Sequence, residues 1–213
     1  MTQPTTRRAL IVVDVQNEYF SGRLRIEYPD PQQSLANISR AMDAAHAAGV
    51  PIVVVQDIES PQSPLFAQGS PGADLHDSVA SRPRDHLVVK NMPSAFANTG
   101  LESWLAERGI DTIAVVGYMT HNCDDSTVKH AVHAGLQVEL LSDATGSVPY
   151  ANSAGQATAE EIHRVLTVVM QSRFAAVMNT EQWVAGLSGA AMPACDNIFA
   201  SNQRALALAA QAT

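Results

Sequence analysis

The chain has 213 residues, 46% of them hydrophobic and 16% charged, which is typical of one globular domain with a full core. Thirteen basic and twenty-one acidic side chains give a net charge of −8, so the positive surface expected of a nucleic-acid-binding or membrane-binding protein is missing. The apolar runs are far shorter than the roughly 20 residues that cross a bilayer. The N-terminus does not follow a signal-peptide pattern, and two cysteines make neither a disulfide framework nor a zinc site. We therefore expect a cytoplasmic protein.

The first part of the chain alternates strand and helix patterns. Residues 9–15 are a continuous apolar run, of the kind that is buried on both faces of a parallel sheet. Residues 32–48 have helical spacing and stop at Gly49, a residue type that often follows a helix C-terminus. Residues 50–55 are a second strand pattern. The loop 56–84 contains four prolines and is long for a compact domain, which is typical of a lid or an oligomer contact.

The rest of the chain repeats this alternation. Thr99 and Gly109 bound an expected helix at 101–108, and Gly135 ends another at 123–134. Further strands are expected at residues 86–90, 112–116, 138–141 and 174–178, and further helices at residues 158–171 and 180–187. In the tail, an Ala- and Leu-rich helix at 203–211 is expected to pack on the body or on a partner subunit.

Six strands that alternate with helices predict right-handed crossovers and a sheet covered on both faces. We predict an α/β protein, a three-layer α-β-α sandwich with a six-stranded, mostly parallel, Rossmann-like sheet. The domain would span residues 1–187 and the tail residues 188–213. The loop that begins at Asp14 has no glycine run to admit a phosphate, which disfavours a flavodoxin-like or dinucleotide-binding module.

Three reactive side chains fall at the expected carboxyl ends of strands, where open α/β sheets form their sites. Asp14 ends the first strand, Lys90 ends the third, and Cys123 opens the helix after the fourth. A buried structural ion pair explains Asp14 and Lys90 equally well when those two are considered alone.

Cys123 favours catalysis over a structural role. A lone cysteine after a strand is often a small buried hydrophobe. A helix N-terminus and a neighbouring lysine, however, predict a lowered thiol pKa and a nucleophilic thiolate. A carboxylate that shuttles protons and an ammonium that stabilises charge would complete the set.

The sequence resembles the isochorismatase-like cysteine hydrolases, which include nicotinamidases, N-carbamoylsarcosine amidases, ureido-acid amidases and streptothricin hydrolases. The resemblance runs from about residue 9 to residue 178. Three ordered motifs carry it, LIVVDVQN at 10–17, VKNMPSAF at 89–96 and VGYMTHNC at 116–123, with Asp143 and Ala144 after the next strand. It implies an isochorismatase-type hydrolase fold, activity without a cofactor, and assembly as a homodimer or higher homo-oligomer.

The resemblance also implies roles for residues. Asp14, Lys90 and Cys123 would be the catalytic triad, with Asp14 taking the thiol proton and passing it to the leaving nitrogen. A non-proline cis peptide would join Tyr118 and Met119. The backbone N–H groups of Met119 and Cys123 would form the oxyanion hole.

The loop after the second strand departs from the nicotinamidase pattern, in which an Asp and a His two residues apart bind a metal with a further His. Here Glu59 stands two residues after Asp57, and His76 lies downstream. Asp57, Glu59 and His76 could bind a metal, but a solvated acidic loop explains them better, and we predict no metal and no nicotinamidase activity.

With nicotinamidase activity excluded, we predict a hydrolase that cleaves the C–N bond of a small amide, lactam or ureido compound through a thioester at Cys123. Expected substrate-binding residues are Gln16, Phe20, Phe96, Tyr118 and His121. Two alternatives stay open. One is an ether or ester hydrolase that uses Asp14 with Cys123 as a bystander, and the other is a catalytically silent small-molecule-binding oligomer.

Overall fold

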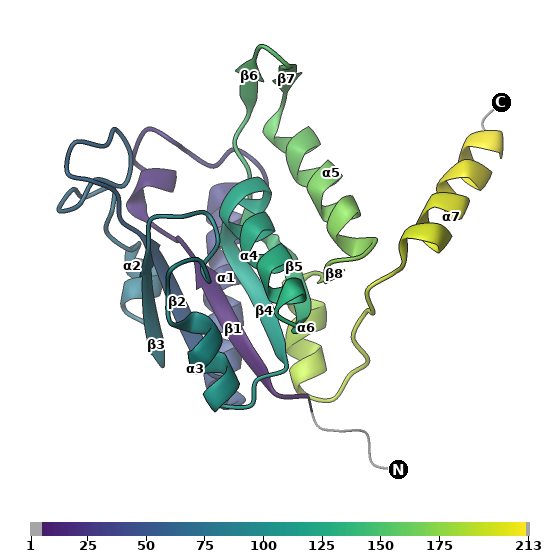
Figure 1. The fold of residues 1–213 in the computed structure, drawn as a ribbon, viewed down its shortest axis with the longest axis horizontal. Coiled ribbons are helices and arrows are strands. Elements are labelled where there is room, and N and C mark those ends of the chain that lie inside the picture. Colours follow the sequence, from purple (N-terminus) through teal and green to yellow (C-terminus); the bar gives the residue numbers. More distant parts are fainter. Residues whose placement is uncertain (1–5, 212–213) are drawn as a thin grey trace.

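The computed structural model describes residues 6–211 (Figure 1). One parallel six-stranded sheet has the order β3-β2-β1-β4-β5-β8. Its strands are β1 (Arg8–Val13), β2 (Ile52–Asp57), β3 (His86–Lys90), β4 (Thr112–Tyr118), β5 (Gln137–Gly146) and β8 (Ala176–Met178). The helices are η1 (Asn17–Tyr19), α1 (Pro31–Ala47), α2 (Asp77–Ala80), α3 (Leu101–Glu107), η2 (Thr120–Asp124), α4 (Asp125–His133), α5 (Ala159–Gln171), α6 (Thr180–Leu187) and α7 (Ile198–Gln211). The predicted three-layer α/β architecture is confirmed.

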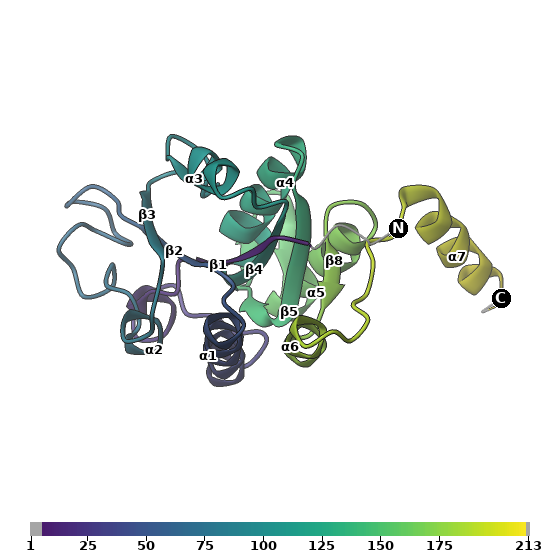
Figure 2. The same ribbon diagram turned by 90° about the horizontal axis from the view of Figure 1, so that it is seen from below.

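Helices cover both faces of the sheet. Figure 2 shows α1 and α6 on one face and α3 and α4 on the other. The central strand β1 supplies both cores, because successive side chains of a strand point to opposite faces. Leu10 and Val12 belong to the core that contains Trp183 of α6. Ile11 and Val13 belong to the core that contains Cys123.

Several helices begin where their sequences provide a cap. Before α5, the Thr158 hydroxyl accepts a hydrogen bond from the Glu161 N–H at 3.2 Å, and the Glu161 carboxylate accepts one from the Thr158 N–H at 2.9 Å. This reciprocal pair satisfies two amide groups that a helix start leaves free. Before α1, Asp30 accepts hydrogen bonds from the first turn, and Pro31 opens the helix.

Four sequence predictions need correction. The 56–84 segment is not wholly irregular, because β2 extends to Asp57 and α2 lies within it. Between the strand predicted at 138–141 and the helix predicted at 158–171, where no further strand was predicted, the chain forms a hairpin of β6 (Tyr150–Asn152) and β7 (Gly155–Ala157). The tail helix is longer than the predicted 203–211, since α7 begins at Ile198. The helix predicted to open at Cys123 is preceded by a π turn, η2, described below.

The tail differs from the body. No residue of α7 is buried, and Figures 1 and 2 show the helix extending away from the sheet and its covering helices. Packing on the body of the same chain, one of the two predictions for this helix, is therefore not what the structure shows. Within residues 6–211, no helix is long and apolar enough to cross a membrane.

Candidate active site

Four side chains meet at the carboxyl edge of the sheet. Asp14 follows β1, Asp57 ends β2, Lys90 ends β3, and Cys123 follows β4. The strand order β3-β2-β1-β4 places these four strand ends side by side. The three residues predicted as a triad are thus brought together from segments far apart in the sequence, and Asp57 joins them.

Lys90 contacts the other three members of this cluster. Its Nζ lies 2.7 Å from Oδ2 of Asp14, 2.8 Å from Oδ2 of Asp57 and 3.5 Å from Sγ of Cys123. The side chains of Lys90 and Asp14 are completely buried. Burial makes such a charge costly unless it is paired, and here two carboxylates share one ammonium.

The chain between β4 and α4 holds the nucleophile. The Tyr118–Met119 peptide is cis, as the resemblance implies. Gly117 has a φ of 117°, and a Cβ at this position would lie 2.0 Å from the carbonyl oxygen of Val13, so only glycine fits.

A wide turn follows. The N–H of Asp124 donates to the carbonyl of Met119 across five residues, at 3.1 Å, which is the hydrogen-bond spacing of a π-helix. Cys123 is therefore the fourth residue of η2, and the α-helix itself begins at Asp125.

The pKa of Asp14 suits a group that exchanges protons near neutrality. Burial raises it from 3.8 to about 6, although the nearby ammonium of Lys90 opposes the shift, and the charge of Asp57 adds to it. Burial alone would lower the pKa of Lys90, but the charge of Asp14, that of Cys123 when its sulfur is ionised, and that of Asp57 outweigh burial and hold that pKa above its ordinary value. Lys90 therefore stays protonated.

The predicted low pKa of Cys123 is wrong for this structure. Burial raises the thiol pKa well above its ordinary value, and the charge of Asp14 raises it further, while Lys90 only partly compensates. The favourable lysine is shared with two carboxylates, which the sequence prediction did not include. In the resting protein the sulfur is a thiol, and it needs a base to become nucleophilic.

A second buried carboxyl lies beside the nucleophile. Asp124 is completely buried, and neither of its oxygens has a hydrogen-bond partner among the described residues. Burial raises its pKa well above 3.8, and the charge of Asp14 adds to the shift. Burial thus favours the protonated form of Asp124 in the folded protein.

Cys123 faces a cavity of about 450 Å³. Met119, Asn122 and Cys123 form one wall together with Tyr150 from the hairpin. The other walls come from the loops after β1, β2 and β3, and include Tyr19, Leu24, Ser63, Pro64, Leu65, Phe66, Asn91, Met92 and Pro93. Asp57 and Glu59 are its charged residues, and none of the described residues that line it is a lysine, arginine or histidine. The lining is therefore mostly apolar with an acidic end.

None of the five predicted substrate-binding residues lines this cavity. The side-chain amide of Gln16 donates to the carbonyls of Asp57 and Ala73 and accepts from the Asp57 N–H, so it holds the end of β2. The ring of Phe20 packs on those of His76 and Tyr118. The Tyr118 hydroxyl shares a 2.8 Å hydrogen bond with Ser34. Phe96 stacks on His130, at 5.0 Å between ring centroids.

His121 supports the cavity through its neighbours. Its Nδ1 lies 3.0 Å from the Ser147 hydroxyl, and its Nε2 lies 3.0 Å from the hydroxyl of Tyr150, which does line the cavity. Burial lowers the pKa of the imidazole, so it is neutral at neutral pH. His121 thus positions Tyr150 and does not itself line the cavity.

The loop residues considered for a metal are not brought together. Asp57 pairs with Lys90, and His76 Nδ1 accepts a hydrogen bond from the Ser78 N–H at the start of α2. Within the described part of the chain, the one group with ligand atoms close enough for a metal is Asp14, Asp57 and Cys123, whose atoms lie within 4.8 Å of one another. The Lys90 ammonium contacts all three, so a second cation there would meet a positive charge.

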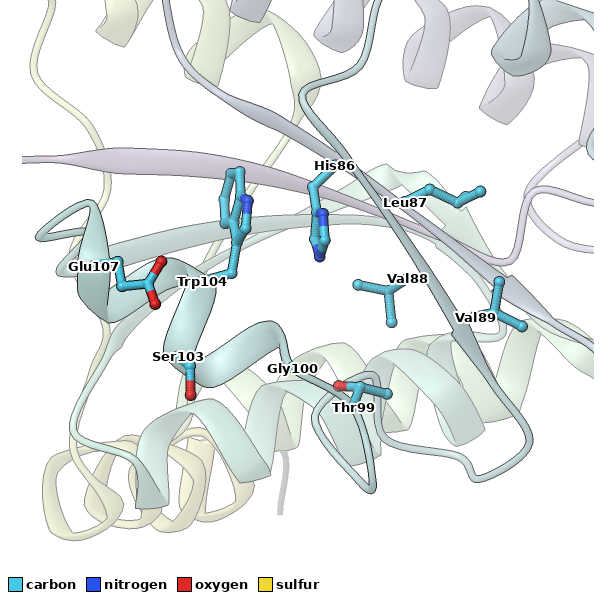
Figure 3. A pocket seen from close by; sticks show the side chains of 9 residues that line it. All are labelled: His86, Leu87, Val88, Val89, Thr99, Gly100, Ser103, Trp104 and Glu107. Atoms are coloured by element: carbon cyan, nitrogen blue, oxygen red, sulfur yellow. The ribbon is translucent and has the colours of Figure 1, made fainter.

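Another cavity lies between β3 and α3. Figure 3 shows His86 and Trp104 at its wall, with Thr99, Ser103 and Glu107 nearby. The two rings are stacked, 5.1 Å apart. The lining contains no cysteine and no lysine, and we assign it no catalytic role.

Asp57 is the main site residue that the sequence reasoning misplaced. It was treated as part of a solvated loop, yet it is paired in register with Lys90 across the parallel strands. The signal was available, because Asp57 also ends an apolar strand pattern, as Asp14 and Lys90 do. Tyr150 and Asn122 carried no such signal, since only the folded loops bring them to the cavity.

The Isochorismatase domain family matches residues 8–182, which include all four residues of the cluster. The chain belongs to the isochorismatase family. The resemblance seen in the three sequence motifs is thereby confirmed, and this isochorismatase-family protein is a hydrolase with the fold of its relatives.

Its relatives include proteins of known and unknown activity. YddQ of Bacillus subtilis (strain 168), an uncharacterized isochorismatase family protein, is 30% identical over 178 residues, which cover 83% of this chain and 98% of YddQ. The ureidoacrylate amidohydrolase RutB of Methylobacterium radiotolerans is 31% identical over 198 residues, which cover 78% of this chain and 73% of RutB. A protein of Burkholderia xenovorans LB400, whose crystal structure is described as that of a "putative isochorismatase", is 65% identical in a match that covers 97% of this chain and 100% of that chain, with a TM-score of 0.95.

Proposed function

We propose that this protein hydrolyses the C–N bond of a small amide, lactam or ureido compound through a thioester at Cys123. The observation that carries the proposal is the contact of one buried ammonium, Lys90, with Asp14 and Cys123 at the floor of a cavity. A base whose pKa is about 6, a thiol within its reach and a fixed positive charge are the parts that acyl transfer requires.

In the first half of the reaction, the Cys123 thiol gives its proton to Asp14 while the sulfur attacks the substrate carbonyl carbon. The resulting tetrahedral oxyanion would be bound by the N–H groups of Met119 and Cys123. Asp14 then returns the proton to the leaving nitrogen, the C–N bond breaks, and a thioester remains on the sulfur.

In the second half, Asp14 takes a proton from water, and the hydroxide attacks the thioester carbonyl. The C–S bond breaks, the acid product leaves, and Asp14 reprotonates the sulfur. Lys90 supports these transfers, because Asp14 and Cys123, the two groups that exchange the proton, both lie beside the same ammonium.

The cavity lining supports a substrate that is neutral or positively charged. Asp57 and Glu59 line it, and Lys90, the cation in contact with Cys123, is already paired with two carboxylates. A substrate carboxylate would therefore meet repulsion without a compensating donor. Three amides of similar length test the effect of substrate charge: butyramide is neutral, 4-aminobutyramide is positively charged and succinamic acid is negatively charged. We expect kcat/KM, or competition with a better substrate, to be at least about tenfold poorer for succinamic acid, a difference of about 1.4 kcal/mol.

The covalent step is tested by mass spectrometry. The protein is mixed with a panel of amides, lactams and ureides and quenched in acid, and the peptide that contains Cys123 is examined for an acyl adduct. We expect an adduct in the wild type and neither adduct nor turnover in Cys123→Ala. Turnover retained by Cys123→Ala would favour an ether or ester hydrolase that relies on Asp14. Ligands that raise the melting temperature without any turnover would favour a binding protein.

A further inference from the structure

The C-terminal helix exposes an apolar surface that nothing in its own chain covers. The large apolar side chains Ile198, Phe199, Leu206 and Leu208 are between 56% and 74% exposed. A helix of this length is marginal in water unless it packs against something, because nucleation is costly and few hydrogen bonds repay it. The apolar residues of α7 therefore require a partner surface.

The body carries a matching surface on α5. Val165, Val168 and Val169, which we call the valine face, are 40% to 60% exposed. Their spacing of three and four residues puts them on one side of the helix, while His163 and Met170 are buried on the other. A stripe of valines on the solvent side of a surface helix is typical of a contact region.

The structure directs α7 away from the valine face of its own chain. The linker before α7 is fixed at the end of α5, where the Gln171 side chain donates to the carbonyl of Ala194 at 2.8 Å and the Gln171 carbonyl accepts from the Asp196 N–H at 2.9 Å. Asp196 in turn pairs with Arg204 in the middle of α7. These contacts hold the start of α7 near the end of α5. From there the helix extends away from the body, as Figures 1 and 2 show.

The match with the related crystal structure extends into α7. It leaves about 3% of 213 residues unaligned, roughly six residues, which is fewer than the 14 residues of α7. Most of α7 therefore has a counterpart there, in a match whose TM-score is 0.95.

We propose that α7 of each copy packs on the valine face of a second copy, so that two copies form a reciprocal dimer.

The surface area buried by the contact favours two exchanged α7 helices, or arms, over one. A 14-residue helix is about 21 Å long and 10 Å wide, so each arm covers roughly 210 Å² on each of the two surfaces in contact. One arm buries about 420 Å², whereas two arms bury about 840 Å² before linker contacts are added, close to the roughly 1,000 Å² that a specific interface needs. Exchange of the same element between both copies also closes the assembly.

Sedimentation of the full-length protein tests the proposal. The wild type is expected at twice the chain mass of 22.7 kDa, and both Leu206→Asp and Val168→Asp at the mass of one chain. Both residues are exposed in a single copy, so neither change disturbs the core, and circular dichroism checks the fold. Leu87→Asp, on the exposed edge strand β3, is the matched control and is expected to leave the dimer intact.

A cross-link identifies the surfaces. In a Cys195→Ser background, Leu206→Cys and Val168→Cys chains are mixed and treated with a short bismaleimide. A covalent dimer that forms only in the mixture of the two variants supports the reciprocal arms. A monomeric wild type, or a dimer that survives both arm-face substitutions but not Leu87→Asp, would overturn the proposal.

Discussion

The ammonium of Lys90 lies 2.8 Å from a carboxylate oxygen of Asp57, almost as close as it lies to Asp14. Two buried carboxylates therefore compete for one positive charge. The competition matters for catalysis because the negative charge of Asp57 contributes to the raised pKa of Asp14. Asp57 is in this respect a positioning residue that tunes the base through their shared lysine.

Asp57→Asn is expected to lower the pKa of Asp14, since it removes one nearby negative charge and leaves Lys90 to Asp14 alone. The acidic limb of the kcat/KM profile, which reports the free enzyme, should move below its wild-type midpoint. The measurement is kcat/KM against pH on any substrate the panel identifies.

Glu59→Gln is the matched control for that shift. Glu59 lines the same cavity but makes no ion pair with Lys90 within the described residues, so its neutral variant should keep the wild-type midpoint. A midpoint that Asp57→Asn leaves unchanged would show that Asp57 does not tune the base.

The wild-type pH profile should show the titration of Asp14 directly. Asp14 accepts the thiol proton only when it is ionised, and its pKa is about 6. Activity should therefore rise as the pH increases through about 6 and should fall below it. Asp14→Asn should reduce kcat by about 10²–10⁴-fold, the usual contribution of a general base, and should abolish this rise. A wild-type profile that stays flat from pH 5 to 8 would contradict the role of Asp14.

Asp124 should weaken the fold as the pH increases. Its pKa is near 3.8 in the unfolded chain and well above that value in the folded protein, so above pH 3.8 the unfolded chain releases a proton that the folded protein keeps. Each such group lowers the free energy of unfolding by about 1.4 kcal/mol per pH unit until its folded pKa is passed. Asp14 adds the same effect up to about pH 6.

Asp124→Asn should therefore stabilise the protein at pH 8 and reduce the decline of stability with pH, as measured by urea unfolding at pH 5 to 8. The control is Asp43→Asn. Asp43 forms a surface ion pair with Arg82, which lowers its pKa, so its loss should cost under about 1 kcal/mol equally at every pH in this range. Greater destabilisation of Asp124→Asn at pH 8 than at pH 5 would disprove the neutral-acid interpretation.

The two cysteines should react in an order set by burial. Cys195 is exposed, whereas Cys123 is buried and its thiol pKa is raised. Iodoacetamide at pH 7 is therefore expected to label Cys195 first, and the rate at Cys123 should increase with pH. Peptide mapping by mass spectrometry measures both rates, with Cys195→Ser as the control. Faster labelling of Cys123 at pH 7 would restore the low-pKa thiolate that the sequence suggested.

The sheet and the residues brought together at its edge could be predicted because their signals are local. Continuous apolar runs mark the strands, and Asp14 and Lys90 stand out as charges at the ends of such runs. The position of each strand in the sheet is a tertiary property, which is why Asp57, on the strand between the other two, was not assigned to the cluster.

The protonation of Cys123 could not be predicted for a similar reason. The sequence predicts that Cys123 lies at a helix N-terminus and that a lysine lies nearby. The helix dipole and the lysine both favour a thiolate. The thiol pKa depends instead on burial and on how many carboxylates share that lysine. The cavity walls were equally hidden, because residues such as Tyr150, Leu24 and Phe66 reach the cavity only once the segments between the strands of the sheet have folded.

The cluster has one consequence for how activity arises during folding. Its members come from four separate strand ends, and the first and last are 123 − 14 = 109 residues apart in the chain. No hairpin or single βαβ unit contains the whole set, and no local segment can form it early. The reactive centre therefore exists only once four neighbouring strands have docked, so recovery of turnover after dilution from denaturant would report completion of the central sheet.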